Sequence, residues 1–192
     1  MSESFNVILP CKPYVKQFII HNFGEPANFS QDKSLSNTLL KALKHPDKRR
    51  DYDSNVKEAV SNYQDKIDLI ISEDVFYRHG WMLTTTDILN INRKLESRVK
   101  CFMYQMIGVS VANGKPIKDS IEDFQQRFDY PEEVWAYESI KKDFQRNGQP
   151  IARSYQNEII QINQRLFMDN LSRLGTLCQK AIKHYENIQQ TA

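Results

Sequence analysis

Five side chains that bind phosphates or base edges in other proteins lie close together in the second half of the chain. They are Ser139, Lys141, Lys142, Gln145 and Arg146. Lys and Arg pair with phosphates or guanine edges, whereas Gln and Ser form hydrogen bonds with base edges or with the DNA backbone. The cluster predicts a nucleic-acid-binding surface, with double-stranded DNA as the expected partner.

The surrounding sequence predicts three helices, of which the last carries this cluster. We expect a long helix over 86–111 and two shorter ones over 116–128 and about 136–147, with a short turn containing Pro131 between the last two. Three helices with the last two tightly joined are the ingredients of a helix-turn-helix. Apolar residues at helical spacing would meet at its centre: Ile121, Phe124, Phe128, Val134, Trp135, Ile140 and Phe144.

Residues 86–148 resemble in outline the small helix-turn-helix proteins of bacteriophages and mobile elements. The phrase WAYESIKKDFQR, from Trp135 to Arg146, carries the resemblance. It implies a non-enzymatic nucleic-acid-binding or regulatory accessory protein of phage or mobile-element origin. The Lys, Gln and Arg side chains of this phrase would then face the DNA groove.

The charge balance argues against nucleic-acid binding. Between Lys115 and Gly148, six Lys or Arg stand against eight Asp or Glu, whereas DNA binding normally depends on a basic face. The whole chain carries a net charge of +2, with a pI near 8.3. Free-standing nucleic-acid-binding domains often exceed a pI of about 9. The alternative is therefore a helical hairpin with a solvated face, in a structural assembly component that makes only protein–protein contacts.

The C-terminal region, 149–192, predicts one long amphipathic helix. Almost nothing between Ala152 and Gln190 breaks a helix, which would be about 55–60 Å long. An oligomerisation seam is expected at four positions: Leu166, Leu174, Leu177 and Ala181. The pattern is not a clean heptad, and Gly175 costs about 1 kcal/mol relative to Ala. Self-association as a homo-oligomer, a bend that gives two antiparallel helices, and packing on another partner all stay open.

The N-terminal region, 1–83, predicts a small α+β unit. Alternating apolar residues indicate strands over 5–9 and 66–72, which we expect to pair. Helices are predicted from Pro13 to Gly24 and over 34–44, 54–64 and 75–80. The densest positive cluster consists of Lys41, Lys44, Lys48, Arg49 and Arg50. Three aspartates interleave it, so a solvated connector is favoured over a phosphate-binding site.

Nothing in the sequence predicts catalysis or metal binding. No phosphate loop, GxGxxG, GxSxG or HExxH motif is present. The histidines and cysteines lack metal-ligand spacing: His21, His45, His79, His184, Cys11, Cys101 and Cys178. We expect no enzyme activity, no cofactor, no metal and no small-molecule ligand. The cysteine usage and the absence of a long apolar run predict a cytoplasmic protein without a membrane partner.

Together these patterns predict a mainly α protein with three regions. Residues 1–83 form the small α+β N-terminal region, 84–148 a trihelical helix-turn-helix-like middle, and 149–192 the long C-terminal helix.

Overall fold

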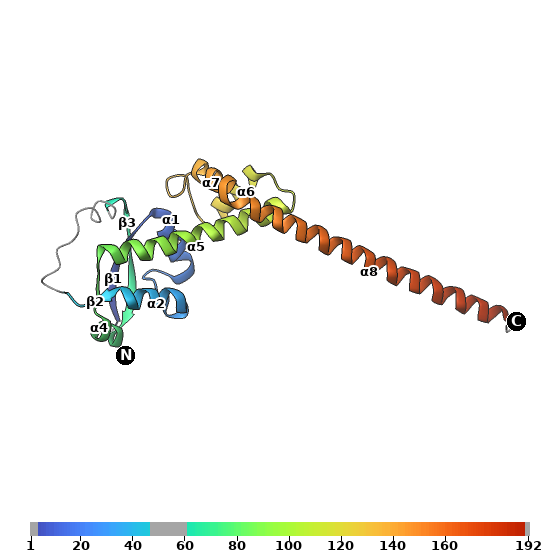
Figure 1. The fold of residues 1–192 in the computed structure, drawn as a ribbon, viewed down its shortest axis with the longest axis horizontal. Coiled ribbons are helices and arrows are strands. Elements are labelled where there is room, and N and C mark those ends of the chain that lie inside the picture. Colours follow the sequence, from blue (N-terminus) through green and yellow to red (C-terminus); the bar gives the residue numbers. More distant parts are fainter. Residues whose placement is uncertain (1–3, 47–60, 191–192) are drawn as a thin grey trace.

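The computed structural model describes residues 4–46 and 61–190, without the side chains of 181–190. Figure 1 shows a two-part head from which a single long helix projects. The elements are β1 (Ser4–Cys11), α1 (Pro13–Phe23), η1 (Phe29–Gln31), α2 (Lys33–Ala42), β2 (Leu43–Lys44), β3 (Asp65–Ser72), α4 (Glu73–His79), β4 (Met82–Leu83), α5 (Thr85–Ala112), α6 (Ile117–Arg127), α7 (Tyr137–Asp143), the π-helical turn η2 (Phe144–Gly148) and α8 (Gln149–Gln190). The protein is mainly α, with a small α+β part at the N-terminus and a long C-terminal helix, as the sequence predicts.

The first part of the head is built on two paired strands. β1 runs antiparallel to β3, with Phe5 opposite Ile71 and Cys11 opposite Asp65, which confirms the predicted pairing. Because side chains alternate along a strand, one face of each strand is buried. The first core takes these residues from the two strands and the helices that cover them: Val7, Leu9, Cys11, Val15, Ile19, Leu35, Leu39, Ile67, Leu69 and Ile71.

A second strand pair closes this part of the head and was not predicted. Leu43 and Lys44 of β2 pair with Leu83 and Met82 of β4. The helix predicted over 34–44 therefore ends at Ala42, since Leu43 has extended backbone angles. The helix predicted over 54–64 lies almost entirely outside the described residues, as do Lys48, Arg49 and Arg50.

The long helix α5 contributes to two cores. Ile91 and Leu95 belong to the first core, whereas Val99, Met103 and Ile107 belong to a second one in the middle of the chain. One rigid helix thus fixes the position of the second part of the head relative to the first (Figure 1). The domain boundary predicted at residue 84, directly before α5, stays a prediction.

The second core is aromatic and lies between α5, α6 and α7. Phe124 of α6 stacks on Tyr130 with ring centroids 5.3 Å apart, and both contact the edge of the Trp135 ring. Tyr130 and Trp135 lie in the connector 128–136 and are buried. Because the connector carries these two rings into the core, it is longer than the short turn expected between the last two helices.

The last helix of the head continues into α8, so no loop separates the regions predicted to meet at residues 148 and 149, and their division into two domains stays a prediction. α7 passes through η2 and then into α8 without a loop. In the wider turn of η2, the backbone N–H of Gln149 bonds the carbonyl of Phe144. Pro150, which cannot donate a backbone N–H, follows directly after this widened turn.

Most of α8 extends away from the head (Figure 1). Ala152 is buried where α8 crosses Gly108 of α5. From residue 160 to residue 180 every side chain is exposed. The helix is continuous through Gly175, so it does not bend there to form two antiparallel helices.

Candidate nucleic-acid interface

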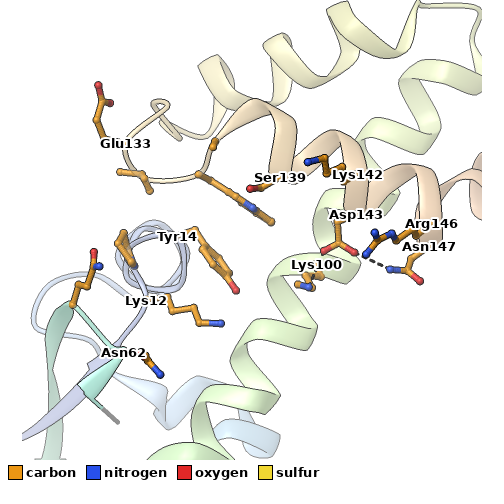
Figure 2. Close-up of a pocket in the computed structure, with 15 residues that line it drawn as sticks. Lys12, Tyr14, Asn62, Lys100, Glu133, Ser139, Lys142, Asp143, Arg146 and Asn147 are labelled. Atoms are coloured by element: carbon orange, nitrogen blue, oxygen red, sulfur yellow. Dashed lines mark hydrogen bonds and ion pairs between the residues drawn. The ribbon is translucent and has the colours of Figure 1, made fainter. Parts of the chain in front are cut away.

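Three of the five predicted nucleic-acid-binding residues line one open cleft. Ser139, Lys142 and Arg146 are exposed on the face of α7 and η2 that borders this cleft. The cleft has a volume of about 730 Å³. Figure 2 shows that its other side is formed by the start of α1 and by α5. These elements supply Lys12 and Lys100.

The other two predicted residues lie outside the cleft. The Nζ of Lys141 is 3.2 Å from Oε1 of Glu138 and lies 5.7 Å from the centroid of the Tyr137 ring. Gln145 is exposed but does not line the cleft. The expected cluster is therefore divided between two sides of one helix.

An aromatic stack holds the cleft together at its base. Tyr14 of α1 stacks on Trp135 with ring centroids 4.5 Å apart, which joins the first part of the head to the second. The Tyr14 hydroxyl donates a hydrogen bond to Glu96 (3.1 Å), and the Nζ of Lys12 donates to the same carboxylate oxygen (2.8 Å). Burial and then the negative charge of Glu96 raise the pKa of Tyr14, so its hydroxyl stays protonated.

The acidic residue next to Lys142 is turned toward α5 and compensated there. Asp143 forms an ion pair with the Nζ of Lys100 (2.7 Å) and accepts 2.7 Å hydrogen bonds from the Tyr104 hydroxyl and the Asn147 amide. Burial opposes ionisation of Asp143, but the hydrogen bonds from these three groups outweigh it and lower its pKa. Asp143 therefore stays charged, and its charge is balanced within the fold by Lys100.

Most other carboxylates between residues 115 and 148 also have a partner. Lys115 pairs with Asp123, Lys118 lies 3.8 Å from Glu122, and Lys141 pairs with Glu138. The remaining contacts are hydrogen bonds, from the Tyr137 backbone to Glu132 and from Gln17 to Asp129.

Lys142 and Arg146 have no such compensation. Among the described residues, neither has a carboxylate within ion-pair distance. The cleft therefore exposes two cations without a carboxylate partner in the part of the chain that the structure describes. Of the two carboxylates that line it, Asp143 is paired with Lys100 and Glu133 lies on the connector 128–136.

Replacing Asp143 tests this electrostatic arrangement. We expect Asp143→Asn to lower the free energy of unfolding by about 1.5–3 kcal/mol at pH 7, since hydrogen bonds to a charged group contribute this much. Because the pKa of Asp143 is lowered in the folded state, its contribution is complete above its unfolded pKa near 4 and disappears as pH falls through the folded value. Denaturant unfolding of wild type and variant between pH 2 and 7 measures this difference.

Asp74→Asn serves as the control for Asp143→Asn. Asp74 forms an exposed ion pair with Arg78, so its removal should change stability by less than about 0.5 kcal/mol. If the difference in free energy of unfolding between wild type and Asp143→Asn stays constant below pH 4, the assigned charge state of Asp143 is contradicted.

Sequence reasoning missed the residues on the opposite side of the cleft. Lys12, Tyr14 and Lys100 are far from α7 in sequence and carry no local signal of a binding site. Of the expected oligomerisation residues, Leu166, Leu174 and Leu177 are exposed on α8. The side chain of the fourth, Ala181, lies outside the described residues.

Neither a metal centre nor a membrane span is found in the described part of the chain. Within it, no three side chains of the His, Cys, Asp or Glu type come together to hold a metal ion. No helix among residues 4–46 and 61–190 combines the length and the apolar character needed to cross a bilayer.

Comparison with protein-family models, curated proteins and solved structures yields no match to this chain. Its function is therefore inferred from its own residues.

Proposed function

We propose that the protein is a non-enzymatic nucleic-acid-binding accessory protein that contacts double-stranded DNA with the α7 side of the cleft. The observation that carries this proposal is the exposure of Lys142 and Arg146 without a carboxylate partner among the described residues. Both are free to replace counterions on phosphates. Lys12 and Lys100 across the cleft are already paired with Glu96 and Asp143, so the proposal depends on the two cations of the α7 side.

The wider setting is part of the same proposal. We place the protein in the cytoplasm, since its three cysteines form no disulfide. An origin in a phage or a mobile element rests on the resemblance of residues 86–148 to small helix-turn-helix proteins. The connector 128–136 is longer than the usual turn of that motif, so the proposal depends on the free cations rather than on the motif.

The double variant Lys142→Ala/Arg146→Ala tests the proposal. We expect its affinity for a fluorescently labelled duplex of about 25 base pairs to fall about 10- to 100-fold at low salt. The loss of two phosphate contacts should also reduce the slope of log K against log salt by about 2. Fluorescence anisotropy across a salt titration measures both quantities.

A second double variant, Lys118→Ala/Arg127→Ala, removes the same two charges from α6, outside the cleft. Its affinity should stay within about twofold of wild type. Equal losses in both double variants would indicate diffuse attraction and contradict the assigned site. If the folded wild-type protein shows no salt-dependent binding, the nucleic-acid proposal fails.

A second candidate is a structural assembly component that makes only protein–protein contacts. The exposed apolar residues along α8 favour it, because monomeric proteins rarely leave a contiguous apolar surface of this kind open to solvent. This candidate predicts stable protein–protein assembly through α8 and no change in duplex mobility at low salt.

A further inference from the structure

The exposed part of α8 is amphipathic. Ile160, Phe167 and Leu174 are spaced seven residues apart and are 47%, 63% and 57% exposed. At 100° per residue they fall on one stripe, and Leu171 lies on it as well. An apolar repeat of seven residues is the pattern by which two helices wrap around one another.

Between residues 158 and 180, charged side chains leave this stripe free. At the same angular spacing, they all fall on the opposite side of α8: Glu158, Arg165, Asp169, Arg173 and Lys180. Both signs are represented among them. In a parallel, in-register pair of identical helices, identical residues come close together, so charges on the stripe would repel. Their position on the far side removes this obstacle to pairing with the same sequence.

Two asparagines in the stripe define the direction of pairing. Asn163 and Asn170 each follow an apolar stripe residue by three positions, and Leu177 occupies the equivalent place one repeat later. In a parallel, in-register pair each asparagine faces its own copy, so the two amides can form hydrogen bonds with each other. In an antiparallel pair the same amides would face apolar residues at other positions of the stripe, where a buried amide without a partner is costly.

We propose that α8 is covered by α8 of a second copy of this chain, in a parallel, in-register two-stranded coiled coil. This inference rests on the protein-contact role proposed above for α8, and it is independent of nucleic-acid binding by the cleft. Both heads then lie at the same end of the dimer. Because α8 is fixed to α5 at the crossing of Gly108 and Ala152, the orientation of each head follows from the coiled coil.

The mass of the full chain in solution tests the pairing. Sedimentation equilibrium should give twice the chain mass of 22.6 kDa. We expect the stripe variant Phe167→Asp/Leu174→Asp to weaken dimerisation at least 100-fold. The matched control Ile162→Asp/Met168→Asp places the same two charges at exposed apolar positions off the stripe, so it should remain dimeric.

Cysteine cross-linking tests the direction. With Cys101 and Cys178 replaced by Ser, Leu177→Cys should form a disulfide-linked dimer under mild oxidation, because position 177 faces itself only in the parallel register. A dimer that fails to cross-link would overturn the parallel arrangement. A wild-type monomer at about 100 µM, or equal losses in the two Asp variants, would overturn the pairing itself.

The coiled-coil proposal and the nucleic-acid proposal can fail independently of each other. Anisotropy of the stripe variant with labelled duplex reports on the cleft of each head alone. Loss of the dimer with retained salt-dependent binding supports both proposals. A monomeric wild-type protein that still binds DNA would remove only the coiled coil.

Discussion

Gly80→Ala should lower the free energy of unfolding by about 3 kcal/mol or more. Gly80 has a φ of +89°, which side chains disfavour, and it lies directly against the backbone of β2. A Cβ atom there would be 2.2 Å from the carbonyl carbon of Lys44 and 2.4 Å from the nitrogen of His45. Since these are backbone atoms, relief requires that β2 move away from β4, which breaks their pairing.

Gly114→Ala separates the steric part of this effect from the backbone part. Gly114 has the same φ of +89°, but no atom lies within 4 Å of the position its Cβ would take. Gly114→Ala should therefore lower the free energy of unfolding only by the cost of placing an alanine at positive φ, about 1 kcal/mol. Urea unfolding followed by circular dichroism gives both values. Equal destabilisation by the two substitutions would show that β2 does not approach Gly80 as closely as described.

Local patterns were sufficient to predict most elements of the head. Residues 5–9 alternate only weakly, because Ile8 stands between Val7 and Leu9, and the clearer alternation over Ile67, Leu69 and Ile71 identified the partner strand β3. The two-residue strands β2 and β4 have no period to detect. Their pairing depends on the chain reversal at Gly80, which brings residues from distant parts of the sequence together.

The end of α7 shows why a local rule failed. Asn147, Gly148 and Pro150 are all residues that usually end a helix. Here the ring of Phe144 occupies the space beside Gly148, and the widened turn η2 carries the helix onward. A buried contact within the second core thus outweighs three local stop signals, and a sequence pattern gives no access to such a contact.

Only one side of the cleft could be predicted from the sequence. The cations of α7 are adjacent in the chain, whereas Lys100, which compensates Asp143, lies on another helix. The net charge of residues 115–148 argued against nucleic-acid binding because a count gives every carboxylate the same weight. In the fold, Asp143 and Glu138 already have cationic partners, so they do not reduce the charge that Lys142 and Arg146 present.

Phe144→Ala should have an effect as large as that of Gly80→Ala, on the other part of the head. Phe144 is fully buried in the second core, at the junction of α7 with α8. Loss of a buried phenyl ring costs about 3–5 kcal/mol through lost contacts and the cavity left behind. The cavity would lie beside Gly148, whose missing Cβ lets the ring pack within the turn. Urea unfolding measures the loss.

Phe167→Ala is the matched control, because Phe167 is 63% exposed and lies outside both cores. At protein concentrations below the dissociation constant of the dimer, Phe167→Ala should leave the free energy of unfolding of the head within about 0.5 kcal/mol of wild type. At higher concentration it should weaken self-association instead. The two phenylalanines thus separate the roles of the helix: the ring at 144 holds α7 and the base of α8 on the head, whereas the ring at 167 is available to a partner. A stability loss at 167 equal to that at 144, independent of protein concentration, would mean that the far part of α8 packs on its own head.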